Sequence, residues 1–231
     1  MVDTVGFRVR NQDRVLQIDG TYTNMEFKSK GTLTPSQQSN DILGYFADVQ
    51  SPSPTAVIAV VGQGDGVYVK KMPNGNFRVY AGRSLPSQVT PFTYYIFDKA
   101  SNTDLGGGFG FVVRSRITGQ VVFNSNRRYL RILDMINATV LPDESSTFSY
   151  PGKSIAPIQC RKSYYRIHSP GGAPNQPVLI IGWKNSCIRN LSTSSFNVWN
   201  RGTHSAQVGG NQYYSDSVPF VSYIVVDVTG L

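Results

Sequence analysis

The sequence predicts an all-β fold, an antiparallel β-sandwich-like domain, and three observations support this prediction. The 231 residues include 13 Tyr, 12 Phe and 22 Gly, and aromatic side chains suit a pleated, half-buried surface while Gly suits turns. Apolar and polar residues alternate with the period of two expected of strands. Helical spacing of apolar residues is not sustained beyond two turns, although residues 36–50 could hold one short helical turn.

Two segments with related sequences predict two related hairpins. The first reads VGFRVRNQDRVLQIDG at 5–20, and the second reads FGFVVRSRITGQVVFNS at 109–125. Both contain Gly-Phe-x-Val-Arg, then a polar turn and a second short apolar strand. Because alternate strand residues share a face, we expect both hairpins to pack in one sandwich-like core. The residues expected on the shared face are Phe7, Val9, Phe111 and Val113.

A third hairpin is predicted at 66–82, where Asn74-Gly75 supplies the dipeptide favoured in two-residue β-turns. Further strands are expected at 55–62, 92–98, 129–135, 160–168, 177–183, 194–200 and 220–231. Residues 202–219 are expected to be rich in loops.

Residues 142–157 are rich in Pro, Ser and Gly and are expected to form a connecting loop. This loop divides the chain into a β-sandwich-like domain at 1–141, which contains the two related hairpins, and a loop-rich β region at 158–231. The final strand of the second region is expected to pack back on the first domain.

The net charge of +8 is carried by dispersed cations, and charged residues make up only 16% of the chain. The densest basic clusters, at 127–131 and 161–166, do not form the Lys/Arg runs typical of nucleic-acid binding. They favour solvated strand faces or an acidic protein partner. The sequence has neither a signal-peptide pattern nor an apolar stretch approaching the roughly 18 residues of a membrane span. We therefore expect synthesis in a reducing cytoplasm, with Cys160 and Cys187 as thiols.

The residue pattern argues against an enzyme, a metal site and a bound cofactor. The soft metal ligands Cys160, His168, Cys187 and His204 lack the closely spaced pair with which zinc sites usually begin. The sequence contains no Gly-x-Ser-x-Gly motif, and several acids stand at turns or strand ends, where they usually bond the local backbone.

Aromatic residues are the candidate contacts to a partner or receptor. Adjacent tyrosines on a strand point to opposite faces, so one of each pair is expected to face outward. Exposed Tyr and Trp are favoured at protein interfaces because they give a large contact area at low entropy cost. Packing of these aromatics in the sandwich core is the alternative. The candidates are Tyr95, Tyr165, Trp183, Trp199, Tyr213 and Tyr214.

The first hairpin, the segment YYIFD at 94–98 and the line GQVVFNS…YLRILD at 119–134 together resemble small all-β proteins of tail-tip or baseplate gene clusters in tailed phages (siphophages). The resemblance covers roughly 5–135 and VVDVTG at 225–230. It departs at Asn124, where the family commonly has Asp, and it does not extend to 142–219.

This resemblance implies a structural protein of the virion tail that is assembled in the host cytoplasm. Its implied partners are other phage tail proteins, and it implies a homo-oligomer within a symmetric tail tip. The alternative function is a receptor-binding module that recognises a host surface glycan, suggested by the aromatic, loop-rich C-terminal region.

Overall fold

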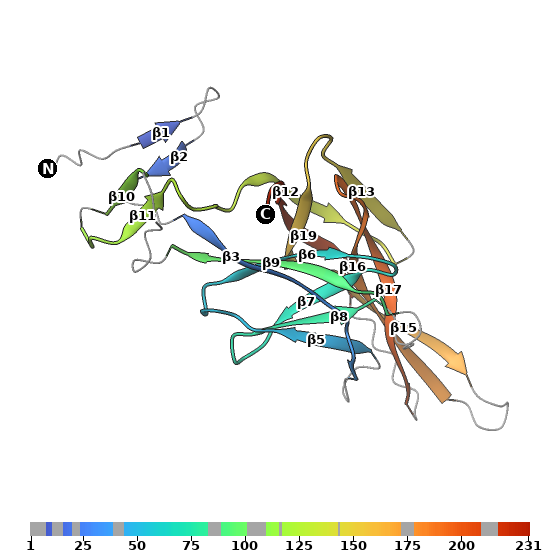
Figure 1. The fold of residues 1–231 in the computed structure, drawn as a ribbon. Helices are drawn as coiled ribbons and strands as arrows, with labels where there is room; N and C mark the ends of the chain where they lie inside the picture. Colours follow the sequence, from blue (N-terminus) through green and yellow to red (C-terminus); the bar gives the residue numbers. More distant parts are fainter. Residues whose placement is uncertain are drawn as a thin grey trace, which may run out of the picture.

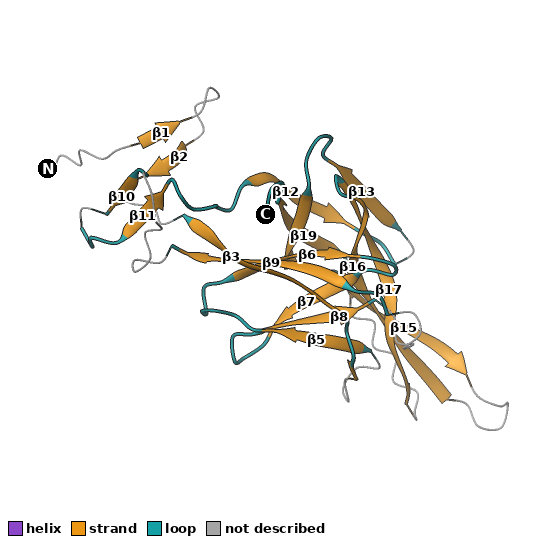
Figure 2. Cartoon of the chain, viewed as in Figure 1, coloured by secondary structure: helices purple, strands orange, loops and turns teal. Residues whose placement is uncertain are grey.

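A computed structural model describes residues 8–10, 16–19, 24–38, 44–82, 89–100, 110–115, 117–142, 144–171, 178–208 and 217–231. Over these ranges the regular structure consists of β-strands joined by turns (Figures 1 and 2). Every strand pairing is antiparallel, so the predicted all-β fold class is confirmed. These ranges contain no helix of the length and hydropathy that crossing a membrane would require.

Two layers of sheet enclose the main core. The first layer is a nine-stranded sheet. Its main path is β13 (Ser145–Ser149), β17 (Ser195–Val208), β16 (Val178–Ser192), β7 (Val67–Lys71), β8 (Phe77–Ala81), β5 (Tyr45–Val49) and β4 (Gln37–Gln38). Off this path, β15 (Tyr164–Gly171) pairs with β16, and β18 (Ser217–Val218) pairs with β15.

The second layer consists of two three-stranded sheets. One has the order β3 (Met25–Leu33), β9 (Phe92–Lys99) and β6 (Val57–Gly62). The other has the order β12 (Ile132–Thr139), β19 (Phe220–Asp227) and β14 (Ile155–Arg161).

Strict alternation along the strands divides the buried side chains between separate clusters. In β6, Ile58 and Val60 belong to the main core, whereas Ala59 between them belongs to a second cluster formed by the two three-stranded sheets. The main core also contains Phe196 and Tyr223, from opposite layers, whose rings meet edge-on at 6.2 Å. Because burying one large apolar side chain contributes about 1.5–3 kcal/mol, these clusters are the main source of stability.

Both predicted hairpins form, and they have the same register. β1 (Arg8–Arg10) pairs with β2 (Leu16–Asp19), and β10 (Val112–Arg114) pairs with β11 (Val121–Asn124). The register shifts after the second residue of the first strand in both, between 9 and 10 and between 113 and 114. The shared register and the shared irregularity confirm that the hairpins are repeated.

The expectation that both hairpins pack in one sandwich core is wrong for the second hairpin, because none of its described side chains belongs to the buried clusters of the body. Each hairpin forms a separate two-stranded sheet, and the side chains of the first lie outside the described residues. Val113 is buried but Phe111 is half exposed, whereas Phe7 and the side chain of Val9 lie outside the described residues. A bulge interrupts the ladder and bends the strand, which keeps each hairpin short.

The repetition extends into the body of the protein. β3 follows the first hairpin and β12 follows the second, and each is the edge of a three-stranded sheet with a register shift near its start. The central strands of these sheets also match, since TYYIFD at 93–98 in β9 corresponds to SYIVVD at 222–227 in β19. Both matched segments end at a buried aspartate, Asp98 or Asp227.

The nine-stranded sheet shows the same relationship. The path β5–β8–β7 corresponds to β13–β17–β16, and the two halves meet where Val67 of β7 pairs with Ile188 of β16. Equivalent strands that pair antiparallel are related by an approximate two-fold axis. The body therefore consists of two structural repeats, here called repeat 1 (residues 8–99) and repeat 2 (residues 112–227).

Three local expectations are wrong. Residues 142–157 contain β13 and the start of β14, because Phe148 packs against the core. Residues 36–50 contain β4 and β5, since Phe46 and Val49 are buried on opposite faces of a strand, and no helical turn occurs in the described part of this segment. β17 extends to Val208, into the segment expected to be loops. Strands from both sides of 142–157 share the main core, and the proposed domain division stays a prediction.

Candidate functional site: the β12 edge

Two of the six predicted contact residues are buried. Tyr95 is 7% exposed and packs in the second cluster, with the Lys30 ammonium 5.2 Å from its ring centre. Tyr165 is also 7% exposed, and its hydroxyl donates to the Val140 carbonyl at 2.7 Å. Pro219 lies opposite Val140 and has no N–H, so this carbonyl needs another donor. The expectation that Tyr95 and Tyr165 contact a partner is therefore corrected to a structural role.

The other four predicted residues do not converge within the described structure. Trp199 is half-buried, and its indole N–H donates to the Asp65 carbonyl at 3.2 Å. The backbone of Trp183 pairs with that of His204 in the β16–β17 hairpin, but the side chain of Trp183 lies outside the described residues. Tyr213 and Tyr214 also lie outside them.

Trp199 belongs to an aromatic row on the outer face of the nine-stranded sheet. The register aligns Trp199 with Cys187, and the pairing of β7 with β16 brings Cys187 beside Tyr68. Tyr68 stacks on Tyr80 at 4.8 Å between ring centres, and Phe46 follows at 5.8 Å. Since Phe46, Tyr68 and Tyr80 are buried, these three rings are not accessible to a sugar ring.

Three cations lie against the rings of this row. The Arg78 guanidinium is 3.8 Å from the Phe46 ring centre, Lys162 is 4.6 Å from that of Tyr68, and Arg189 is 4.3 Å from that of Trp199. Burial lowers the pKa of Lys162 below its ordinary value. Each such contact contributes roughly 0.5–2 kcal/mol, so the row stiffens the sheet. Only the long-range register reveals it, which is why the sequence did not indicate it.

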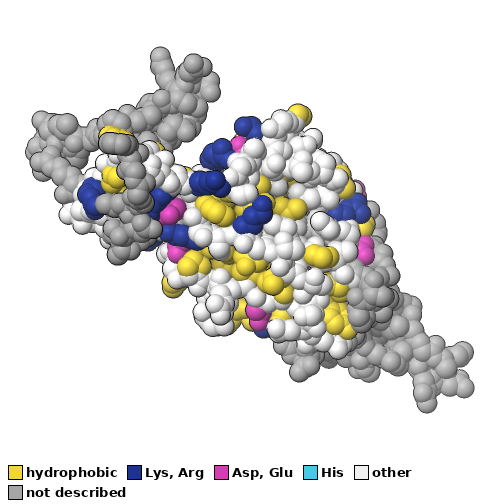
Figure 3. Space-filling model, viewed as in Figure 1, with side chains coloured by type: hydrophobic (Ala, Val, Ile, Leu, Met, Phe, Trp, Pro, Cys, Tyr) yellow, Lys and Arg dark blue, Asp and Glu magenta, His cyan; other side chains and the backbone are white. Residues whose placement is uncertain are grey.

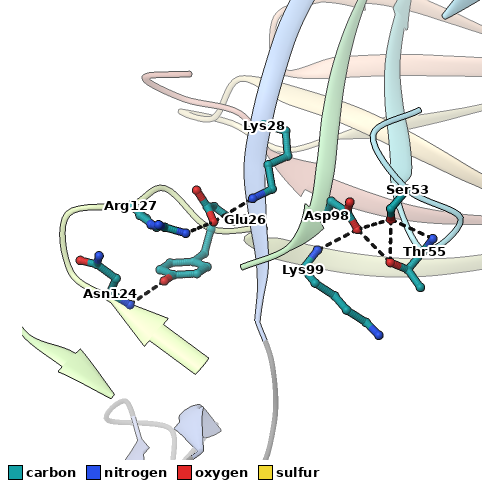
Figure 4. Close-up of polar contacts among 9 residues, drawn as sticks. Glu26, Lys28, Ser53, Thr55, Asp98, Lys99, Asn124 and Arg127 are labelled. Carbon is teal, nitrogen blue, oxygen red and sulfur yellow. Dashed lines mark hydrogen bonds and ion pairs between the residues drawn. The ribbon is translucent and has the colours of Figure 1, made fainter. Parts of the chain in front are cut away.

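The first basic cluster contacts the protein's own polar groups. Arg127 and Lys28 both form ion pairs with Glu26, at 2.5 and 3.0 Å (Figure 4). Arg128 and Arg131 donate to the carbonyls of Gly230 and Thr229. The three arginines line a hollow of about 360 Å³ with Tyr129 and residues 229–231, and Lys and Arg side chains gather on this face in Figure 3. These contacts tie the end of the last strand to the start of repeat 2.

The buried aspartates of the two repeats are also held by internal donors. Asp98 accepts hydrogen bonds from the hydroxyls of Ser53 and Thr55 and from the Lys99 N–H at 2.8–2.9 Å (Figure 4). Burial alone would raise the pKa of Asp98, but these hydrogen bonds outweigh it and lower the pKa. Burial and hydrogen bonds oppose each other in the same way at Asp227, whose pKa is also lowered. Both carboxylates are structural strand-end groups.

Within the described residues, no three His, Cys, Asp or Glu side chains come together in a group that could hold a metal ion. Neither cysteine forms a disulfide, and Cys160 is exposed whereas Cys187 is buried. The side chains of His168 and His204 lie outside the described residues.

The outer edge of β12 presents backbone groups to solvent. Val140 N–H donates to the Pro219 carbonyl beside β19, so Ala138 and Ile136, two and four residues earlier, also direct their backbone groups to β19. The groups of Met135, Asn137 and Thr139 therefore point away from the sheet. In agreement, Met135 N–H donates to the Asp134 carboxylate at 2.7 Å.

Large apolar side chains are exposed along this edge. Met135 is 67% exposed, Ile132 is 53% exposed, and Phe220, beside Thr139 on β19, is 52% exposed. β12 contains neither Lys nor Pro, and its single charged residue is Asp134. Lys and Pro on an edge normally discourage pairing with another chain, and exposed edges are used for strand addition. We define the β12 edge as Ile132–Thr139 with Phe220.

No family model matches this sequence, and no curated protein or solved structure matches it either. The two repeats provide an internal comparison for the β12 edge.

β3 of repeat 1 is the internal equivalent of β12. Thr32 hydrogen-bonds to Thr93 opposite it on the central strand, as Asn137 does to Ser222. Counting back two residues, Lys30 corresponds to Met135. β3 thus has a lysine where β12 has an exposed methionine, so of the two equivalent edges only β12 lacks this protection.

Proposed function

We propose that this chain is a virion structural protein of a tailed bacteriophage, a tail-tip or baseplate component that mediates protein–protein assembly at the distal tail. The observation that carries the proposal is the β12 edge, which combines outward backbone groups with exposed Met135, Ile132 and Phe220. The resemblance of residues 5–135 to tail-tip proteins supports the same class.

The described chemistry is consistent with a scaffold. The buried acids Asp98 and Asp227 close strand ends, and the buried thiol of Cys187 lies in an aromatic row. The two-layer sandwich holds the β12 edge in a fixed position, because β12 contributes Ile136 to the main core. We accordingly propose a non-enzymatic role in the virion, with other tail proteins as partners.

Mass spectrometry of purified virions tests this proposal. We expect the chain among the virion proteins at a fixed copy number, and antibody labelling is expected at the distal end of the tail. Absence from purified particles that retain their other tail proteins would refute the role.

The receptor-binding alternative is favoured by one specific observation. β16 and β17 are 15 and 14 residues long, and the ends of these strands that lie away from their connecting turn project beyond the rest of the sheet with β15 alongside (Figure 1). Such an arm could reach a host glycan with Trp183 near its base. If so, purified protein should block phage adsorption, and Trp183→Ala or Tyr213→Ala should abolish the block. Phe220→Ala, at the β12 edge, should preserve it.

A further inference from the structure

We propose that the β12 edge binds a second copy of this chain, with the two β12 strands pairing antiparallel about Asn137. The pairing joins two three-stranded sheets into one continuous sheet. This inference does not depend on the virion role, because it rests only on the geometry of the edge.

The backbone pattern of the edge is self-complementary. Outward groups belong to Met135, Asn137 and Thr139, which are spaced symmetrically about Asn137. When two copies pair on a two-fold axis through Asn137, Asn137 faces its counterpart and Met135 faces Thr139 of the second copy. Each outward N–H and C=O then has a partner. Shifting this register by two residues would leave some of them unpaired.

The side chains suit the same register. Met135 of the second copy lies beside Thr139, whose other neighbour on β19 is Phe220. Two exposed apolar side chains thus flank each Thr139, and the dimer buries two such groups. Asp134, the charged residue of β12, faces the uncharged Val140 of the second copy, so no like charges meet.

Asp134 limits the strength of this pairing. Two hydrogen bonds form at Asn137 and two at each Met135–Thr139 pair. In each copy, however, Met135 N–H is already held by the Asp134 carboxylate at 2.7 Å. Each copy contributes one intermolecular bond that uses the Met135 N–H, and these two bonds require the N–H to leave the Asp134 carboxylate. The other intermolecular bonds form without rearrangement. We therefore expect reversible association.

The repeats themselves associate in this manner. Within one chain, β7 and β16 are equivalent strands that pair antiparallel where Val67 meets Ile188. The β3 edge, in contrast, already pairs at its start with residues 128–130 and has Lys30 where β12 has Met135, and both features oppose a second interface of the same kind. Pairing through this edge gives a closed dimer, since the same surface serves both copies.

Site-specific disulfide trapping tests the register. In a Cys160→Ser background, Asn137→Cys places two thiols at directly facing positions about 5.5 Å apart between Cα atoms, which is compatible with a disulfide. The matched control is Thr139→Cys, because two Thr139 positions are about 13 Å apart along the paired strands. We expect an interchain disulfide in the first variant and none in the second. Equal cross-linking of both, or of neither, would overturn the register.

Equivalent prolines test the edge by sedimentation equilibrium. Proline is tolerated on an edge strand where its missing N–H faces solvent. Asn137→Pro should therefore remain folded but lose the dimer, whereas Thr32→Pro, at the equivalent position of β3, should keep it. A wild-type chain that is monomeric throughout a concentration series and forms no Asn137→Cys cross-link would overturn the proposal. So would a dimer that persists in Asn137→Pro.

Discussion

The hydroxyl of Tyr150 donates a hydrogen bond of 2.8 Å to the Asp134 carboxylate, and this contact joins two edge strands of opposite layers. Tyr150 follows β13, the edge of the nine-stranded sheet, and Asp134 belongs to β12. The other oxygen of the same carboxylate accepts the N–H of Met135. Asp134 therefore closes one end of the β12 edge, and the remaining part toward Thr139 is open.

Removing the Tyr150 hydroxyl should weaken the fold in a pH-dependent way. Burial and the Asp134 carboxylate raise the pKa of Tyr150 above its usual value. Such a group stabilises the fold fully below the unfolded pKa of about 10, and the contribution is lost as pH rises further. Tyr150→Phe should lower the free energy of unfolding by about 1 kcal/mol at pH 7. Urea unfolding should show this difference shrinking above about pH 10; a difference independent of pH would contradict the assignment.

The buried aspartates should control stability at acid pH. The folded pKa values of Asp98 and Asp227 are lowered, so their contributions are present above the unfolded pKa of about 3.9 and are lost as pH falls below it. Asp98→Asn and Asp227→Asn should each cost about 1–3 kcal/mol at pH 7 and little near pH 2.

The control for these variants is Asp48→Asn, which removes an exposed ion pair with Arg78 and should cost less than about 1 kcal/mol. Denaturant titrations at the two pH values measure all three variants. Equal losses for Asp48 and Asp98 would show that burial of the carboxylate has no influence.

Exchanging the equivalent side chains of the two edges should change association more than stability. Met135→Lys introduces the protective charge of β3 into β12 and should yield a monomer, because two lysines would lie in the interface. Lys30→Met makes the β3 edge resemble β12 and should add assemblies larger than a dimer. Met135→Lys should change the unfolding free energy by no more than about 0.5 kcal/mol. Lys30→Met also removes the contacts of Lys30 with the Leu231 carbonyl and the Tyr95 ring, and should cost about 0.5–1 kcal/mol. Light scattering with chromatography measures the masses, and unchanged masses in both variants would argue against the edge.

The turn between β12 and β13 should depend on Asn200 more than on Tyr165. The Asn200 amide donates to the carbonyls of Val140 and Leu141 at 2.8 and 2.9 Å and accepts from the Ser163 hydroxyl at 2.8 Å. Asn200→Ala leaves several buried groups short of partners and should cost about 2–3 kcal/mol. Tyr165→Phe leaves Val140 with the Asn200 donor and should cost about 1 kcal/mol. The reverse order in thermal unfolding would contradict this account.

Local patterns were enough to predict much of the fold. Asn74-Gly75 predicted a tight hairpin, and the hairpin forms with a three-residue turn, residues 73–75, in which Gly75 has a positive φ of 87°. The doubled Gly-Phe-x-Val-Arg sequence predicted two hairpins that share a register. A further signal, the similarity of TYYIFD to SYIVVD, was present in the sequence and marks the repeat of the central strands.

The candidate site depends on information that local patterns do not contain. Alternation places Tyr94 and Tyr95 on opposite faces, but both faces of β9 are covered, so neither points freely to solvent. The residues near Met135 do not indicate that β12 is an edge strand, because its position follows from pairing with the distant β19. The same applies to the meeting of Val67 with Ile188.

Hydrogen exchange of the outward amides tests most directly whether the β12 edge is the assembly surface. An unpaired edge amide exchanges rapidly, and strand addition protects it. The account predicts that protection of Asn137 and Thr139 rises with protein concentration, while the equivalent Thr32 in β3 stays unprotected. Exchange at Asn137 and Thr139 that remains as fast as at Thr32 at every concentration would contradict it.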